Sequence, residues 1–175
     1  NFAAFGDCGR GTTHQGDVAR VLTAKDPHLV VVTGDIVYPT GKDKDYDSNF
    51  FPYYKDIMSR RPFFPAVGNH DYANSWFTGR GTRRFNSGYA RVFRRPPYYS
   101  FDAGPVHFVS LDTNRAFGTR AAASIAAGSE QVLWLERDLA ASRAPWKIAL
   151  LHVPLYSLLT RSDNASLRRV LEPIF

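Results

Sequence analysis

The sequence has little sulfur, with one cysteine and one methionine among its 175 residues. A single cysteine, Cys8, excludes an intrachain disulfide and leaves the redox compartment undecided. No apolar run approaches the roughly 20 residues that a helix needs to cross a bilayer, so we expect no membrane span. An initiator methionine and a signal-peptide pattern are also missing, and we interpret the sequence as a fragment or a processed chain.

The composition is that of a globular protein. Hydrophobic residues make up 44% of the chain and charged residues 22%. A chain of 175 residues can bury a substantial core but is short for two domains. We therefore expect one domain that covers residues 1–175.

The formal net charge of +6 has two interpretations, contact with a polyanion or attraction of a phosphorylated substrate. Between Trp76 and Pro97 there is no acidic residue but there are six arginines: Arg80, Arg83, Arg84, Arg91, Arg94 and Arg95. This stretch is either a solvated loop or a rim that faces a substrate. Because no nucleic-acid-binding motif accompanies the charge, we expect a small phosphorylated substrate and no nucleic acid. The sequence does not identify the oligomeric state.

Three short apolar runs each lead into a glycine and then into a side chain that can bind metal. The runs are 2–5, 29–32 and 63–67, and the side chains that follow them are Asp7, then Asp35 and Tyr38, then Asn69 and His70. Open α/β sheets bind ligands at the carboxyl ends of their strands. The pattern therefore predicts one site built from three strand ends.

The remaining pattern predicts an α/β order with a second sheet. A helix over 13–25, with Val18, Val21 and Leu22 on one face, makes the opening β-α-β. A polar loop over 40–47, a helix over about 49–59 and an irregular stretch over 73–97 follow. A hairpin over 98–102 and 106–111, a helix over 129–142, a strand over 146–151 that ends at His152, and a last helix complete the expected order.

Asp7, Asp35, Asn69 and His152 offer a mixed set of oxygen and nitrogen donors that suits Mn, Fe or Zn. A carboxylate can bridge two ions, and paired ions commonly hydrolyse phosphate esters. Each residue alone is ambiguous, since Asp and Asn are frequent in turns and a histidine at an apolar strand end is often structural. All four at successive strand ends favour a metal site.

Tyr38 has two interpretations. A phenol has a pKa near 10 and binds metal well only as phenolate, which a strongly Lewis-acidic ion such as Fe(III) can generate. The alternative is an aromatic ring that packs beside the strand end.

Four motifs, taken in order, resemble those of the calcineurin-like metallophosphoesterases, and most closely the purple acid phosphatase branch. They are GDCG at 6–9, GDIVY at 34–38, GNHD at 68–71 and LLHVPLYS at 150–157. The stretches 98–113 and 129–139 also read like that branch, so the resemblance covers nearly the whole chain.

The resemblance implies a four-layer α/β/β/α sandwich, two facing mixed sheets flanked by helices, that is incomplete at its C-terminus. It implies that Asp7 and Tyr38 bind a first, ferric ion, that Asp35 bridges two ions, and that Asn69 and His152 bind a second, divalent ion (Fe, Zn or Mn). Asn69 and His70 would contact the phosphate, and His70 would help to protonate the leaving group. The implied reaction is hydrolysis of phosphate esters, most of all phosphomonoesters, by a metal-bound hydroxide. The branch is often secreted, which favours a secreted or periplasmic location.

Two departures from the family pattern stand out. Most of the superfamily has Asp-X-His at the first motif, whereas Gly9 stands here, and Tyr38 supplies a replacement ligand only in the purple acid phosphatase pattern. The Gly-His-X-His motif that closes the family's site does not occur, and we expect it downstream of Phe175. Cys8, His28 and His107 match no ligand position, and we expect structural roles for them.

Two alternatives remain open. One is a phosphodiesterase or nucleotidase of the same superfamily with a different metal pair. The other is a non-catalytic relative whose metal site is incomplete, which the missing Gly-His-X-His motif suggests.

Overall fold

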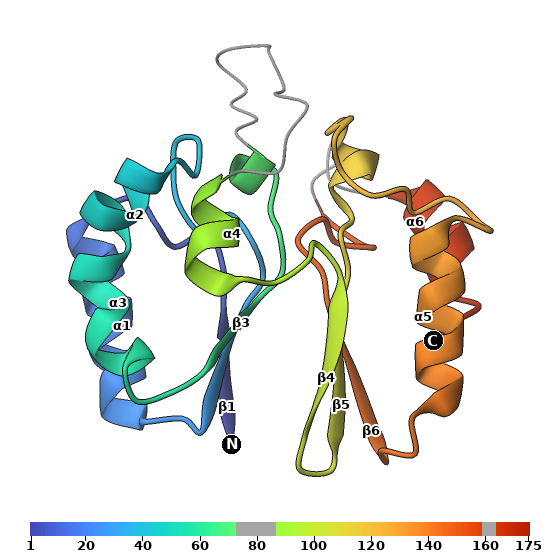
Figure 1. The fold of residues 1–175 in the computed structure, drawn as a ribbon, viewed down its shortest axis with the longest axis horizontal. Helices are drawn as coiled ribbons and strands as arrows, with labels where there is room; N and C mark the ends of the chain where they lie inside the picture. Colours follow the sequence, from blue (N-terminus) through green and yellow to red (C-terminus); the bar gives the residue numbers. More distant parts are fainter. Residues whose placement is uncertain (73–86, 159–163) are drawn as a thin grey trace.

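The computed structural model describes residues 1–72, 87–158 and 164–175. Within them two three-stranded sheets lie face to face, and helices cover the outer side of each sheet (Figure 1). The order of layers is helices, sheet, sheet, helices, which confirms the predicted α/β/β/α sandwich. Both sheets were expected to be mixed, but among the described strands only the second sheet is.

The first sheet has the strand order β1-β2-β3, and its described strands are all parallel. The strands are β1 (Phe2–Phe5), β2 (Leu29–Val32) and β3 (Phe63–Pro65). Their connections form α1 (Thr13–Lys25), α2 (Asp43–Asn49) and α3 (Phe51–Met58) on the outer face. Parallel strands need such crossovers, and as a result the three strands all end at the same edge of the sheet.

The second sheet is mixed, with the strand order β4-β5-β6. β4 (Tyr99–Ala103) and β5 (Val106–Ser110) form the predicted antiparallel hairpin, and β6 (Trp146–Leu150) lies parallel to β5. Its outer face carries α5 (Glu130–Ala141) and α6 (Ala165–Leu171). The short helices η1 (His70–Tyr72), α4 (Ser87–Phe93) and η2 (Asn114–Phe117) lie in the connections.

β2 is apolar at every position because both of its faces are covered. Val30 and Val32 belong to the core between the first sheet and its helices. Leu29 and Val31 point the other way, into the core between the sheets, where they meet Phe108. The alternation of side chains along a strand thus joins the two cores through one four-residue element.

The apolar face predicted for α1 is buried only at Leu22. Val18 and Val21 are 46% and 60% exposed, whereas Ala19 and Leu22 are buried. Gln15 also faces inward because its side chain is satisfied there: Oε1 accepts hydrogen bonds from backbone N–H groups, and Nε2 donates to the carbonyl of Asn49. A polar side chain whose oxygen and nitrogen both have hydrogen-bond partners therefore lies on the buried face, where helical periodicity alone predicted apolar residues.

The segment after β2 also differs from the prediction. The expected loop over 40–47 contains most of α2, whereas the expected helix over about 49–59 corresponds to α3, which is separated from α2 by Phe50. Phe50 has φ −122° and ψ −60°, outside the helical range, and Pro52 lies in the first turn of α3, where its missing N–H costs nothing.

The stretch predicted to be irregular contains α4, and residues 73–86 lie outside the described ranges. Arg91 on α4 pairs with Asp43 and Asp47, and Arg95 lies over the rings of Phe64 and Tyr99. These contacts are structural. Three of the six arginines of the possible rim, Arg80, Arg83 and Arg84, lie outside the described residues. Among the described residues, no helix has the length and apolar character to cross a membrane.

Candidate metal centre

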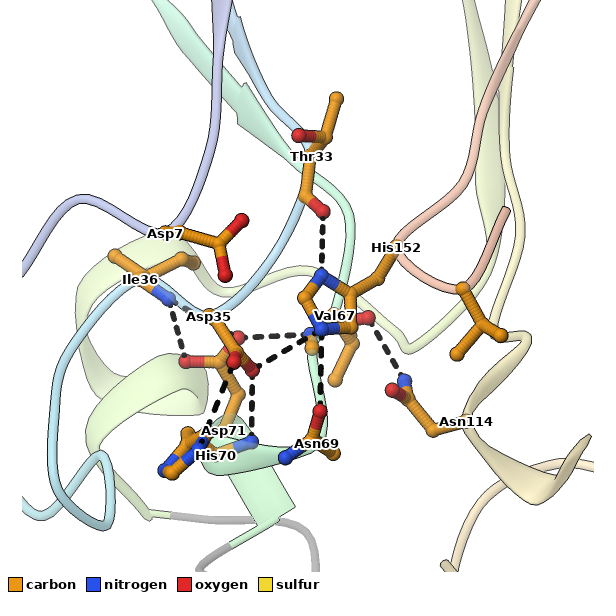
Figure 2. A network of polar contacts seen from close by, with 12 residues as sticks. Asp7, Thr33, Asp35, Ile36, Val67, Asn69, His70, Asp71, Asn114 and His152 are labelled. Carbon is orange, nitrogen blue, oxygen red and sulfur yellow. Dashed lines mark hydrogen bonds and ion pairs between the residues drawn. The ribbon is translucent and has the colours of Figure 1, made fainter. Parts of the chain in front are cut away.

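Side chains from four strand ends meet at the edge where both sheets terminate. Asp7, Asp35 and Asn69 follow β1, β2 and β3, and His152 follows β6 of the opposite sheet (Figure 2). Ligand atoms of Asp7, Asp35 and His152 all lie within 4.8 Å of one another. The sequence-predicted site residues are therefore brought together, including the one from the second sheet.

Asp35 lies at the centre of this group and is only 3% exposed. Its Oδ1 accepts the backbone N–H of His70 at 2.8 Å and lies 3.4 Å from Nε2 of His152. Its Oδ2 lies 2.9 Å from the hydroxyl of Tyr38. The two oxygens of the Asp35 carboxylate thus face different side chains, Oδ1 facing His152 and Oδ2 facing Tyr38.

Tyr38 points its hydroxyl between two carboxylates, 2.7 Å from Asp7 Oδ1 and 2.9 Å from Asp35 Oδ2. A phenol has one hydrogen and can donate to only one of them, so three oxygens converge on one point. Burial, followed by the charge of Asp35, raises the pKa of Tyr38 well above its usual value. This set of oxygens fits a hard, highly charged cation, which would offset the repulsion between the carboxylates.

His152 is oriented by the carbonyl of Thr33, which lies 2.9 Å from its Nδ1 (Figure 2). A carbonyl only accepts, so the hydrogen-bond network assigns the proton to Nδ1 and leaves the lone pair on Nε2. Nε2 faces Asn69 Oδ1 at 3.2 Å and Asp35 Oδ1 at 3.4 Å. Three acceptor atoms that face each other fit a cation, and a carbonyl behind the ring is how proteins orient metal-binding histidines.

His70 lies at the edge of the group. Its Nδ1 is 2.6 Å from the carbonyl of Pro39, its Nε2 is 3.8 Å from Asp35 Oδ2, and its ring centroid is 4.4 Å from that of Tyr38. The ring is thus held beside the oxygen cluster, with Nε2 turned toward Asp35.

Both strand-end aspartates have left-handed backbone conformations, with φ of 52° at Asp7 and 50° at Asp35. Residues other than glycine adopt this conformation infrequently, although Asp tolerates it better than most, and such strain concentrates at functional sites. Each aspartate follows a glycine, and a Cβ on Gly34 would lie 2.7 Å from Nδ1 of His152. The close approach of His152 to the first sheet therefore requires glycine there.

The backbone around Gly9 leaves no room for a side chain. A Cβ at Gly9 would lie 2.0 Å from the carbonyl oxygen of Ile36, and the N–H of Tyr38 donates to the Gly9 carbonyl at 2.9 Å. No side chain fits at this position, and the segment that excludes it carries Tyr38. Cys8 points away into the core, where its Sγ contacts the Ile36 carbonyl and burial raises the pKa of its thiol.

Sequence reasoning assigned no role to Asp71, which the structure places beneath the site with no exposed surface. Its carboxylate accepts the N–H groups of Gly68 at 2.8 Å and Ile36 at 3.2 Å, joining the loops that follow β3 and β2 (Figure 2). Burial, and then the charge of Asp35, raises the pKa of Asp71 well above its usual value. The signal in the sequence that could have identified Asp71 is its position directly after Asn69 and His70.

Two other histidines lie away from the site, as expected. His107 is held between Asp102 and Asp138, and His28 lies at the surface near Asn1. Arg10, which the sequence did not single out, lies with its guanidinium carbon 4.0 Å above the ring of Tyr38.

Comparison with known proteins finds relatives among the purple acid phosphatases. Purple acid phosphatase 15 of Arabidopsis thaliana is 30% identical over 90% of this chain and 34% of its own length. Purple acid phosphatase 22 of the same plant is 26% identical over 99% of the chain and 40% of its length. A third protein of this plant, "Probable inactive purple acid phosphatase 9", is 26% identical over 81% of the chain and 25% of its own length. The chain thus spans well under half of each of these relatives.

The family model described as calcineurin-like phosphoesterase matches residues 1–173. The match includes all four strand ends that carry the candidate ligands. The chain therefore belongs to the calcineurin-like phosphoesterase family, within which it is similar to the purple acid phosphatases.

Proposed function

We propose that this chain, as a single domain over residues 1–175, hydrolyses phosphate esters at a dinuclear metal centre and prefers phosphomonoesters. The observation that carries the proposal is the convergence of donors from four strand ends, with Asp7, Asp35 and His152 inside 4.8 Å. Family membership and the phosphatase names of the similar proteins support it.

The donors divide into two sets that share Asp35. Asp7 and Tyr38 surround its Oδ2 and would hold a first ion, which we assign as Fe(III) because the ligand set includes a phenol. Asn69 and His152 surround its Oδ1 and would hold a second, divalent ion, Fe, Zn or Mn. Asp35 is then the bridge.

When bound, the ions would supply an activated water and the positive charge that stabilises phosphoryl transfer. The chain's own contribution is to position groups around them. Asn69 and His70 would contact the phosphate oxygens. His70 donates from Nδ1 to the Pro39 carbonyl, so Nε2 carries a proton only when the ring is an imidazolium, and in that form it would give this proton to the leaving alkoxide or phenoxide.

The proposal is tested by loading the protein with iron and zinc and measuring hydrolysis of p-nitrophenyl phosphate. We expect Asp35→Asn to lower kcat by about 10²–10³-fold or more, since it removes charge shared by both ions. Asp17→Asn, the same change on the exposed face of α1, should leave kcat unchanged. Equal activity of wild type and Asp35→Asn would refute the assignment.

Substrate class is tested in the same assay with bis(p-nitrophenyl) phosphate. A monoesterase should hydrolyse this diester poorly. Faster turnover of the diester would instead favour the alternative of a phosphodiesterase or nucleotidase.

A second candidate function is metal or phosphate binding without turnover. Similarity to a relative whose name calls it probably inactive favours it. Stoichiometric binding of both ions without hydrolysis of either ester would identify this case.

A further inference from the structure

The two candidate metal sites differ in how they are built. The donors of the first ion all come from the first sheet, whereas the second ion requires His152 from the opposite sheet. Between the sheets lies an apolar core that includes Val31, Phe108 and Leu150. Apolar packing has no directional preference, so directional contacts are needed to set His152 against Asn69 to within a fraction of an ångström.

The segment 112–114, directly after β5, supplies such contacts. Asp112, Thr113 and Asn114 are polar, yet none has any exposed surface. Asn114 Nδ2 donates to the carbonyl of Val67 at 2.8 Å, two residues before Asn69 (Figure 2). Asp112 Oδ2 accepts from the hydroxyl of Tyr72 at 2.5 Å, three residues after Asn69. The loop that carries Asn69 is therefore bonded to this segment on both sides.

Thr113 provides the contact to the other ligand. Its Oγ1 accepts the backbone N–H of Val153 at 3.0 Å, and Val153 directly follows His152. The bond is buried, so the N–H has no water to replace the hydroxyl if it is removed. The segment 112–114 thus forms hydrogen bonds to the loop that carries Asn69 and to the loop that carries His152. These are the two residues that would bind the second ion together with Asp35.

We propose that Thr113 is a positioning residue for the second metal ion, holding His152 at binding distance from Asn69 and Asp35. This inference rests on the proposed function and deepens it, because it separates the two ions by what positions their ligands. Asp112 and Asn114 anchor the segment, with Asp112 further fixed by α5 through Gln131, whose Oε1 accepts the Asp112 N–H at 2.8 Å.

The test is a calorimetric titration of Zn²⁺ into the metal-free protein, which should resolve two sites in the wild type. Thr113→Val keeps the shape of the side chain but removes the acceptor for the Val153 N–H. We expect it to weaken one site by 10- to 100-fold, the range found when groups behind metal ligands are changed, and to leave the other unchanged. Thr113→Ser, which keeps the hydroxyl, should restore wild-type affinity at both sites.

A second measurement needs no metal. Amide hydrogen exchange of Val153 in the metal-free protein should be at least tenfold faster in Thr113→Val than in the wild type or Thr113→Ser.

Unchanged affinity at both sites in Thr113→Val, or equal weakening of both together with a loss of folded structure, overturns the positioning role. Failure of the proposed function gives a different result in the same titration, because the wild-type protein would then bind no Zn²⁺ at either site.

Discussion

Tyr38 is the residue on which the identity of the first ion depends. In the absence of metal its pKa is raised by burial and by two carboxylates, so a phenolate requires a strongly Lewis-acidic ion among the same three oxygens. We predict that the iron-loaded protein has a visible tyrosinate-to-iron absorption band, and that Tyr38→Phe abolishes it. Tyr53→Phe, on α3, should keep the band. A colourless, fully active iron-loaded protein would contradict the ferric assignment.

Gly9 is a second residue whose role is set by what surrounds it. A Cβ there would collide with the backbone of Ile36, so Gly9→Ala must displace the segment that leads to Tyr38. We expect a loss of about 1–3 kcal/mol in unfolding free energy, together with weaker metal binding. Urea unfolding and metal titration measure the two effects.

Gly16→Ala is the matched control for Gly9→Ala. Gly16 lies inside α1, and its added Cβ would meet only Tyr53 at an ordinary 3.6 Å. It should raise the unfolding free energy by about 0.5–1 kcal/mol through helix propensity. A rise in unfolding free energy in both variants would mean that the close approach at Gly9 is relieved without cost.

At the scale of elements, His107 joins three of them. It lies on β5, with Nδ1 2.6 Å from Asp102 on β4 and Nε2 2.8 Å from Asp138 on α5. Carboxylate oxygens only accept, so this geometry suits an imidazolium that donates from both nitrogens. Burial alone would lower the pKa of His107, but the hydrogen bonds to both carboxylates outweigh it and raise the pKa. Lys147, its neighbour on β6, donates to the carbonyl of Ala144 instead.

This raised pKa predicts a pH-dependent contribution to stability. Because the folded-state pKa exceeds the unfolded value near 6.5, the stabilisation is complete below that pH and is lost as pH rises through the folded-state pKa. His107→Gln should therefore cost about 1–3 kcal/mol at pH 5 and less at pH 9, as measured by urea unfolding.

The two carboxylates should not contribute equally. The side chain of Asp102 is 73% exposed and that of Asp138 only 19%, so solvent screens the first bond although it is shorter. Asp138→Asn should reproduce most of the effect of His107→Gln, and Asp102→Asn little of it. An equal loss for His107→Gln at both pH values would show that the imidazolium does not contribute.

At the scale of the molecule, the proposed ions connect both sheets, since Asp35 and His152 come from opposite ones. An ion that binds only the native state at 100 times its Kd adds about 2.7 kcal/mol of stability. For a chain of this size, chelation should therefore lower Tm by roughly 5–11 °C, and added Zn²⁺ should restore it. His152→Ala should show a smaller shift. A Tm that is indifferent to chelation would contradict binding at this edge.

The fold was largely predictable because its signals are local. Apolar runs of four or five residues, interrupted by glycine and proline, identified the described strands, and helical spacing identified α1 and α5. The errors occurred where a distant partner decided the outcome. Gln15 faces inward because Asn49 accepts its hydrogen bond, and α2 forms within a segment whose polar composition predicted a loop.

The sequence by itself determined which residues could serve as ligands and that they follow strands, because ligand chemistry and strand patterning are properties of short segments. Only the tertiary structure decided that His152 meets Asp35 across two sheets and that backbone contact excludes any side chain at Gly9. It alone showed that Asp71 and Thr113 tie the ligand loops together. Those features depend on atoms far apart in the chain, and packing brings them within hydrogen-bonding distance.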